Sequence, residues 1–492
     1  MGRTQSVRAV NRSWTAALSA AAVTVGLSVA MATSVEADGH GGPCGQSAGG
    51  GSGSPGSLGS LGSTANSGST GSLIGSLGSG SLGSATGSLA NSLPWIIGSP
   101  DGALPVLTGR TKAIEMVTGP GSPNKSIEKY GVSGTDLGIM WDNGQGQVLM
   151  AFGDTFGDCD DPPTQWRSNV LFRSSDETLR DGMRIDSSPL APPPPENYSK
   201  QIIDGLLDLP LGSFEFTVLP TAGVAVYEED RDRWVQYVRF MSVREWGAPG
   251  EWTTNYSAVA RSDDNGETWD VVVPTVRVNL DPMDPAFPDG IVPPAFSSNN
   301  GNWQMSAFVP GGDGYVYEFG TTSGRNGAAR LARVPANPAD LEDLNEYQYW
   351  TGTVWSPNIA DAEPVIEEPV SELSVQWNDY LGKYIAMYTD VGGLKIRLAD
   401  HPEGPWSGTQ TLISPDTLPS LYGGFMHPWA TGQYLYFVLT TWDRYNVIYM
   451  RTDLSKLDKM SPADQVDRPD PAKTGEQKLL RFDIPEDLPE EK

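Results

Sequence analysis

The stretch GTDLGIMWDNGQGQVLMAFGDTFG, residues 134–157, contains two apolar runs on either side of Asn143-Gly144. Asn-Gly between two such runs is typical of a tight β-hairpin turn. The stretch therefore predicts antiparallel strands over 135–141 and 147–152. A further β-branched and aromatic run, 169–174, adds a third strand to this small sheet.

Comparable groups of short strands follow along the chain. No segment between the flanks keeps the 3.6-residue apolar period of a long helix. Three to four strands in each of five groups predict an all-β fold, a five-bladed β-propeller, with a β-sandwich as the alternative. The four later groups cover 223–227, 233–243, 256–261 and 269–273; 303–309, 315–321, 328–334 and 347–350; 372–378, 383–388 and 394–398; and 424–429, 434–440 and 446–451.

One turn motif supports the propeller. Residues 262–269, SDDNGETW, fit the S-x-D-x-G-x-x-W pattern of the Asp-box, a hairpin found in propeller glycosidases. In that hairpin the aspartate binds turn amides and the Trp packs beneath them. We therefore expect Asp264 to have a structural role on the outer side of a blade.

The flanks differ in composition from the centre. Three arginines precede an uncharged, Ala-rich run, which predicts a signal peptide over 1–37; an uncleaved membrane anchor is the alternative. A Gly/Ser/Leu-rich segment, 38–93, predicts a disordered linker, and 457–492 an acidic, mostly disordered tail. The propeller domain is predicted over 94–456.

Composition excludes several classes of function. The 492 residues include 33 Lys and Arg against 60 Asp and Glu, a net charge of −27, so nucleic-acid binding is not expected. Three His and two Cys are too few for a zinc cluster or a disulfide framework. We expect no metal and no cofactor. Cys44 and Cys159 either pair after export or remain free thiols.

Two carboxylates are predicted to meet at the mouth of the first hairpin. Asp136 begins one strand and Asp154 ends its partner, 18 residues later. Because an antiparallel hairpin brings its outer ends together, the two side chains are expected to face each other. Glycoside hydrolysis needs such a pair, one carboxyl as acid and the other as base or nucleophile.

The innermost strand of each blade lines the axis of a propeller. The starts of the five predicted inner strands are therefore candidate site positions. They are Asp136, Gly223, Gln304, Glu372 and His427.

Several stretches of the chain resemble a known family. They are GTDLGIMWDNGQGQVLMAFGDTFG (134–157), WRSNVLFRSSD (166–176), NWQMSAFVPGGDGYVYEFGTTSGRNGAARLARV (302–334), SELSVQWNDYLGKYIAMY (371–388) and GGFMHPW (423–429). From Lys112 to Leu454 the chain is similar to the DUF4185-type domain of actinobacteria, grouped as glycoside hydrolase family 183, the endo-D-arabinanases. The resemblance implies a secreted or cell-envelope-associated enzyme that cuts internal α-D-arabinofuranosyl bonds in arabinogalactan and lipoarabinomannan. It implies that the catalytic pair is Asp136 and Asp154.

Other polar and aromatic residues in these stretches are predicted to bind substrate, because amides, guanidinium groups and aromatic faces suit sugars. They are Arg167, Asn169, Arg325, Glu372, Trp377, His427 and Trp429. The expected partner is a cell-envelope arabinan, bound by a monomer with no stable membrane insertion once the signal is cleaved. The alternative is a non-catalytic propeller that binds envelope glycan.

Overall fold

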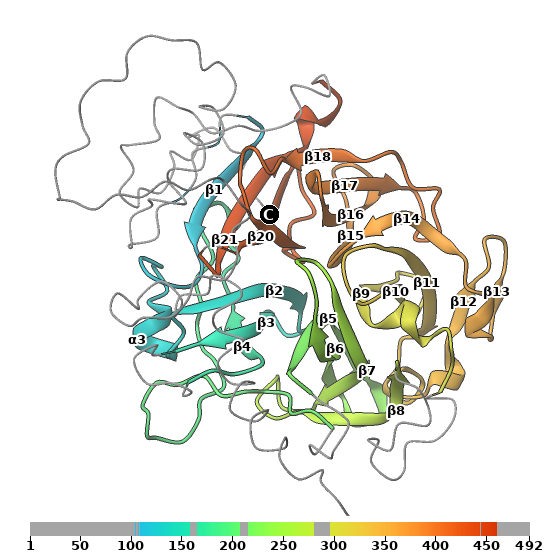
Figure 1. The fold of residues 1–492 in the computed structure, drawn as a ribbon, viewed down its shortest axis with the longest axis horizontal. Coiled ribbons are helices and arrows are strands. Elements are labelled where there is room, and N and C mark those ends of the chain that lie inside the picture. The colour runs from blue at the N-terminus through green and yellow to red at the C-terminus, as the bar shows by residue number, and fades with distance from the viewer. Residues whose placement is uncertain are drawn as a thin grey trace, which may run out of the picture.

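The computed structural model describes residues 104, 107, 109–157, 165–206, 215–279, 296–442 and 444–459. Its strands form five antiparallel sheets arranged around one axis, a five-bladed β-propeller (Figure 1). The predicted fold is confirmed, and the sandwich is not what the chain forms. The predicted signal peptide and linker, both cysteines and the chain beyond residue 459 lie outside the described residues.

Four blades are built from consecutive strands. Blade 1 contains β2 (Gly134–Asp142), β3 (Val148–Phe156) and β4 (Val170–Ser174), and blade 2 contains β5 (Thr217–Glu228), β6 (Arg233–Trp246), β7 (Trp252–Ser262) and β8 (Asp270–Val278). Blade 3 contains β9 (Met305–Pro310), β10 (Tyr315–Thr321), β11 (Gly327–Pro335), β12 (Gln348–Trp350), β13 (Trp355–Ser356) and β14 (Pro364–Val370). Blade 4 contains β15 (Leu373–Asn378), β16 (Lys383–Asp390), β17 (Gly393–Ala399) and β18 (Gln410–Ile413).

The helices in the described part of the chain are short, and all but the last lie between strands. The α-helices described there are α3 (Ser126–Tyr130) and α4 (Pro338–Leu341). The 3-10 helices are η1 (Leu179–Asp181), η2 (Glu229–Arg231), η3 (Asn300–Trp303), η4 (Leu344–Glu346), η5 (Ile359–Asp361) and η6 (Leu454–Lys459). No helix in the described ranges is long and apolar enough to cross a membrane.

Blade 5 joins the two ends of the domain. It contains β19 (Leu421–Met426), β20 (Tyr434–Thr441) and β21 (Asn446–Asp453), and its outermost strand is β1 (Thr111–Met116). β1 pairs antiparallel with β21, beside which it lies in Figure 1. The five groups of strands predicted from the sequence did not include β1. Its six residues have no neighbouring hairpin turn that would pair them with an adjacent strand.

The apolar core lies between neighbouring blades. One cluster joins Trp141 of blade 1 to Val238 of blade 2, and a second joins Tyr237 of blade 2 to Trp303 before blade 3. A third cluster spans blades 3 and 4, and the largest spans blades 4, 5 and 1. Each sheet therefore buries both faces against its neighbours, so its strands read as continuous apolar runs rather than as alternating ones.

A buried ion cluster lies between blades 2 and 3. Glu318 on β10 forms ion pairs with Arg239 on β6 and with Arg277 on β8, at 3.0 and 2.9 Å. All three side chains are fully buried. Ser306 on β9 also donates to Glu318, at 2.7 Å. Because removing one partner would leave an uncompensated buried charge, this cluster fixes how the two blades meet.

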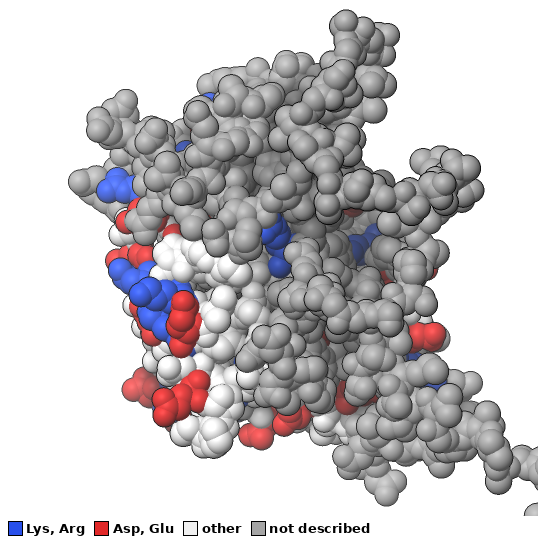
Figure 2. All heavy atoms as spheres, turned by 60° about the vertical axis from the view of Figure 1, so that its left-hand side comes forward, with Lys and Arg blue, Asp and Glu red and all other residues white. Residues whose placement is uncertain are grey.

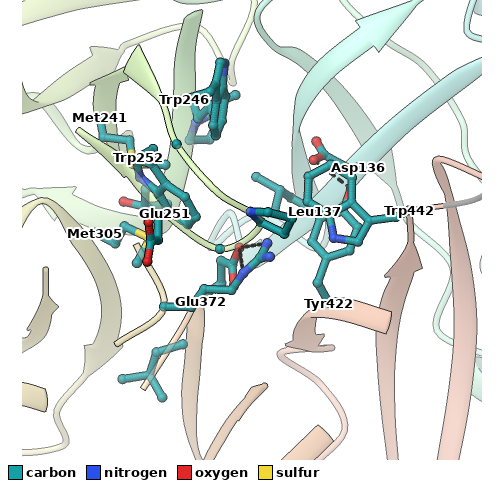
Figure 3. Close-up of a pocket in the computed structure, with 18 of the residues that line it drawn as sticks. Asp136, Leu137, Met241, Trp246, Glu251, Trp252, Met305, Glu372, Tyr422 and Trp442 are labelled. Atoms are coloured by element: carbon teal, nitrogen blue, oxygen red, sulfur yellow. Dashed lines mark hydrogen bonds and ion pairs between the residues drawn. The ribbon is translucent and has the colours of Figure 1, made fainter. Parts of the chain in front are cut away.

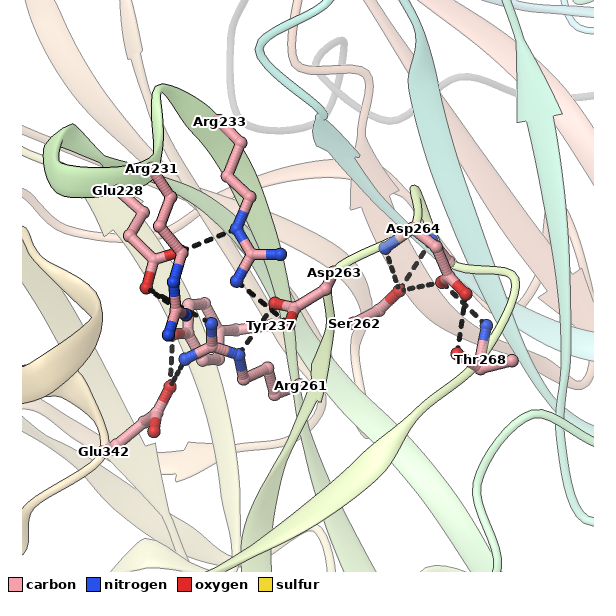
Figure 4. Close-up of polar contacts among 11 residues, drawn as sticks. Glu228, Arg231, Arg233, Tyr237, Arg261, Ser262, Asp263, Asp264, Thr268 and Glu342 are labelled. Carbon is pink, nitrogen blue, oxygen red and sulfur yellow. Dashed lines mark hydrogen bonds and ion pairs between the residues drawn. The ribbon is translucent and has the colours of Figure 1, made fainter.

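The Asp-box turn forms as expected (Figure 4). Asp264 Oδ1 accepts from the backbone N–H groups of Glu267 and Thr268, at 3.1 and 2.8 Å. The Trp269 ring packs edge-on against Trp141 of blade 1, with ring centroids 6.4 Å apart. The motif therefore anchors the outer turn of blade 2 to its neighbour, away from the axis.

Charged side chains of both signs share the described surface. Figure 2 shows Asp and Glu side chains around the rim of one face, with a group of Lys and Arg side chains between them. In Figure 4, Arg261 donates to Asp263 and Glu342, at 2.8 and 2.5 Å. The arginine here is therefore held in local ion pairs, and the excess of carboxylates over Lys and Arg gives the chain its net charge of −27.

A substitution at Gly223 tests the packing between blades 1 and 2. A Cβ at this position of β5 would lie 2.1 Å from Trp141 Cε3. We expect Gly223→Ala to lower the free energy of unfolding by about 1–3 kcal/mol, because the indole must shift in a packed core. Gly408→Ala, whose Cβ would meet no atom within 4 Å, is the control. Urea denaturation of the two variants should show a loss for Gly223→Ala alone; equal stabilities would contradict the packing argument.

Candidate active site

A cavity of about 370 Å³ lies on the propeller axis where the inner strands begin (Figure 3). Every blade contributes to it. Lining residues come from the starts of β2, β5, β9, β15 and β19, and include Asp136, Leu219, Met305, Glu372 and Tyr422. Trp246 to Trp252, the connection between β6 and β7, forms one wall.

Asp136 is the buried carboxyl of this cavity. Its side chain is 6% exposed, and Tyr422 donates a hydrogen bond of 2.9 Å to Oδ2. Oδ1 is buried without a hydrogen-bond partner in the structure. Burial raises the pKa of Asp136 to about 7, although the phenols of Tyr422 and Tyr445 favour its charged form. Near neutral pH this carboxyl therefore exists in both protonation states.

An irregularity in β2 directs Asp136 to the cavity. The pairing with β3 shifts register on both sides of Leu137, whose φ is +66°. In a regular strand consecutive side chains point to opposite faces, yet Asp136 and Leu137 both line the cavity. A non-glycine residue in the left-handed region is strained, and such strain is concentrated at functional sites.

Asp154 lies beside Asp136 across the hairpin mouth but does not line the axial cavity. A Cβ on Gly153, the preceding residue, would lie 2.3 Å from Asp136 Oδ1, so this glycine leaves room for the carboxyl. Asp154 Oδ1 accepts a hydrogen bond of 2.5 Å from Thr217 Oγ1. Tyr445 has a raised pKa through its burial and the nearby charges of Asp136 and Asp154. The phenol of Tyr445 therefore lies close to both carboxyl groups.

Arg325 and Glu372, predicted as substrate-binding residues, form an ion pair at the cavity. Arg325 Nη2 lies 2.7 Å from Glu372 Oε1, and Nε lies 3.1 Å from both carboxylate oxygens. The guanidinium also packs 5.0 to 5.6 Å from the rings of Tyr422, Trp252 and Trp442. Burial opposes the charge on Glu372, but Arg325 keeps its pKa below the ordinary value. Glu372 is therefore the ionised carboxylate of the cavity.

The sequence analysis missed several cavity residues. Tyr422 and Trp442 come from blade 5, Trp252 begins β7, and Glu251 lies in the β6–β7 connection. Glu251 is exposed and lines the cavity, and Figure 3 places it across from Asp136. No local motif marks these positions, since they reach the site only through the closure of the ring.

Arg167 and Asn169, also predicted to bind substrate, are used within the fold. Arg167 donates to the backbone carbonyls of Ser199 and Gly131, at 3.1 and 2.8 Å. Asn169 is fully buried and its amide bonds four backbone groups of the 202–218 region. Both side chains hold the connection between blades 1 and 2, and neither lines the axial cavity.

Trp377, His427 and Trp429 lie at the opposite end of the axis. Trp377 is near the end of β15, and His427 and Trp429 follow the end of β19. Trp429 Nε1 donates to Asp142, the last residue of β2, at 2.7 Å. Burial lowers the pKa of the His427 imidazole to about 3, so this ring is neutral. The structure separates these three residues from Asp136. His427 and Trp429 lie far from it because the fifth inner strand begins at Leu421 rather than near His427, and Trp377 lies near the far end of its own inner strand.

Metal ligands are not grouped in the described part of the chain. No cluster of three or more His, Cys, Asp or Glu side chains there is placed to hold an ion.

The sequence from residue 121 to 451 matches the family model described as "Domain of unknown function (DUF4185)". This chain belongs to the DUF4185 family. It is also similar to "Notoamide biosynthesis cluster protein J" of Aspergillus sp. (strain MF297-2), with 30% identity over 345 residues that cover 65% of this chain and 83% of the fungal protein. "Notoamide biosynthesis cluster protein J'" of Aspergillus versicolor is likewise 30% identical over 345 residues, covering 65% and 84%.

Solved structures show a weaker likeness to this DUF4185 protein. An exo-β-1,3-galactanase from Phanerochaete chrysosporium has a TM-score of 0.40 and 10% identity, covering 74% of this chain and 67% of the galactanase. A glycosyl hydrolase from Bacteroides ovatus has a TM-score of 0.39 and 8% identity, covering 72% and 94%. At these scores the likeness carries no functional argument for this chain.

The raised pKa of Asp136 predicts a pH-dependent gain in stability on its removal. The unfolded carboxyl releases its proton near pH 4, whereas the folded one keeps it until about pH 7. The folded state therefore loses stability relative to the unfolded state as pH rises from about 4 to 7. We expect Asp136→Asn to raise Tm by several degrees at pH 8 and by little at pH 4. Calorimetry across this range measures the difference.

Asp264 provides a control of opposite sign. Although burial opposes its charge, hydrogen bonds from Thr268 and Ser262 keep its pKa below the ordinary value. Asp264→Asn should therefore lower Tm at pH 8 and have less effect as pH falls toward 3. A stability gain from Asp136→Asn that did not change with pH would contradict the assignment of Asp136 as the group with the raised pKa.

Proposed function

We propose that this DUF4185 protein is a secreted glycoside hydrolase of family 183, an endo-D-arabinanase. Its substrate in this proposal is the α-D-arabinofuranosyl backbone of arabinogalactan and lipoarabinomannan in mycobacterial-type cell envelopes. The observation that carries the proposal is the buried Asp136 carboxyl, whose pKa is raised by burial to about 7, in an axial cavity beside Asp154. The resemblance of residues 134–157 to glycoside hydrolase family 183 supplies the substrate class, an α-D-arabinan.

In this proposal Asp136 is the general acid. A carboxyl with a pKa near the working pH is suited to proton transfer, because it is protonated in a large fraction of molecules and still releases its proton readily. Asp136 protonates the glycosidic oxygen as the bond to the anomeric carbon breaks. Asp154 supplies the second carboxylate, which activates water or attacks the anomeric carbon. Tyr445, close to both groups, is placed to hold them in position.

The cavity walls suit a ring-shaped substrate. Trp252 and Trp442 present aromatic surface, against which the C–H face of a sugar ring packs. Ionised Glu372 accepts hydrogen bonds, and its pairing with Arg325 fixes its orientation. Glu251 adds a carboxylate from the opposite wall.

Incubation of the full chain with mycobacterial arabinogalactan, followed by mass spectrometry of the products, tests the proposal. A ladder of arabino-oligosaccharides is expected; intact polymer would refute hydrolysis.

Removal of either proposed catalytic carboxyl should abolish cleavage. We expect Asp136→Asn and Asp154→Asn each to lower kcat by about 10²- to 10⁴-fold, the usual effect of losing an acid or base. Asp264→Asn, in the Asp-box turn away from the axis, is the control for an aspartate that the chemistry does not use. Product formation from arabinogalactan measures the rates. Near-full activity in either of the first two variants would show that the pair is misassigned.

The pH profile tests the assignment of the acid. If Asp136 donates the proton, kcat should fall as pH rises above about 7. Tyr422→Phe removes a hydrogen bond that favours the charged carboxylate, so this limb should move to higher pH. Initial rates between pH 4 and 9 measure both effects. A rate that instead rises through pH 7 would make Asp136 the base.

A second candidate function rests on the apolar side of the cavity. Leu137, Leu219, Met241, Met305 and Phe425 all line it. Such walls also suit a compact, largely apolar small molecule, and the names of the two fungal relatives place those proteins in a biosynthesis cluster. Equilibrium dialysis of indole and of arabino-oligosaccharides against the Asp136→Asn protein separates the two. Saturable binding of indole without binding of oligosaccharide would favour the second candidate.

A further inference from the structure

A groove of about 710 Å³ opens between blades 3 and 4 at the end of the axis opposite Asp136. Its inner edge is formed by Pro310, the last residue of β9, and Trp377, the penultimate residue of β15. The same two residues line a second cavity of about 290 Å³ among the inner strands. The groove therefore begins beside that cavity and extends outward between the two blades.

An exposed aromatic side chain forms one side of this groove. Trp377 is 39% exposed, although it belongs to an inner strand. Its Nε1 donates a hydrogen bond of 2.9 Å to Asp379 Oδ1, and the Tyr384 ring packs edge-on against it at 5.1 Å. The indole is therefore held in a fixed orientation while part of its surface faces solvent, so little entropy is lost when a ligand packs on it.

Carboxylates and phenols complete the lining. Asp313 accepts a hydrogen bond of 2.7 Å from Tyr317, and the charges of Asp313 and Glu403 both act on Tyr317 and Tyr384. Glu403 has no hydrogen-bond or ion-pair partner in the described part of the chain. It therefore offers free acceptor oxygens beside an aromatic surface.

The cations of the groove are already engaged. The Arg333 guanidinium lies between the rings of Tyr315 and Trp355, at 4.3 and 4.2 Å, and donates to Gln348. Lys383, which precedes the groove residue Tyr384 in β16, is paired with Asp400 at 2.5 Å, and the basic residue that remains in the lining is His401. An anionic ligand would therefore meet uncompensated carboxylates and is disfavoured.

We propose that this groove is a second carbohydrate-binding site, which holds a neutral polysaccharide. The C–H face of one sugar ring packs on Trp377, and its hydroxyl groups donate to the carboxylates of Glu403 and Asp313. The identity of the polysaccharide, an arabinan, rests on the proposed function. Because the groove and the Asp136 cavity lie at opposite ends of the axis, a chain held in the groove leaves the cavity open for another part of the same polymer.

Binding is measured with the full chain carrying Asp136→Asn, so that the polymer is not cut. In depletion assays on insoluble arabinogalactan, adding Trp377→Ala should weaken binding roughly three- to tenfold, the typical effect of losing an aromatic packing contact. Adding Glu403→Gln should also weaken it. The matched control is Tyr380→Ala, since Tyr380 is 48% exposed but does not line the groove. Unchanged binding in Trp377→Ala, or an equal loss in Tyr380→Ala, overturns the proposal.

Two further measurements separate this site from the catalytic one. In the otherwise unaltered chain, Trp377→Ala should leave cleavage of a short soluble arabino-oligosaccharide unchanged and slow cleavage of the insoluble polymer. Equal losses on both substrates would overturn the second site.

If the unaltered chain cuts arabinogalactan but the Asp136→Asn chain binds it independently of Trp377, the groove proposal alone fails. If Trp377-dependent binding is found without any cleavage, the proposed function alone fails.

A cationic ligand is the competing chemistry for a carboxylate-lined aromatic groove. Polylysine is the probe, in competition with arabinogalactan for the Asp136→Asn protein. Retained arabinogalactan binding at physiological salt in the presence of polylysine supports the proposal. Trp377-dependent binding of polylysine, with none of arabinogalactan, overturns it.

Discussion

The architecture depends on the packing of each sheet face against the next blade. Each blade here is apolar on both faces and cannot bury those faces by itself, so it is stabilised by its two neighbours. The apolar clusters accordingly span pairs of blades, and the Arg239–Glu318–Arg277 cluster adds a charged contact at one junction. Because the blades are fixed relative to one another, five strand starts distant in sequence meet around one cavity.

The first hairpin shows what local sequence can predict. Turn chemistry at Asn143-Gly144 and the 18-residue spacing of Asp136 and Asp154 are properties of one short segment, and the structure brings the two aspartates to the same hairpin mouth. The irregular step at Leu137, which turns Asp136 toward the axis, has no comparable signature, since leucine is not a residue that favours positive φ.

Positions that depend on long-range closure were harder to predict. Tyr422 contacts Asp136 across 286 residues of sequence, and no periodicity encodes such a contact. His427 was assigned to the wrong end of its strand because the glycine-rich beginning of β19, Leu421 to Gly424, does not read as a strand. Trp377 lies on an inner strand, as the sequence pattern indicates, but an inner strand has two ends, and strand composition does not say which end faces the cavity.

The pairing of β1 with β21 also constrains when the axial cavity can form during synthesis. β1 is among the first strands to leave the ribosome, and its partner is the last strand of the domain. Until β21 is made, the nascent chain carries an unpaired strand at its beginning and an incomplete set of inner strands around the axis. The cavity cannot assemble in a partly synthesised chain. A chain interrupted before β21 would therefore lack the cavity and be exposed to edge-to-edge aggregation, which couples formation of the cavity to completion of the whole domain.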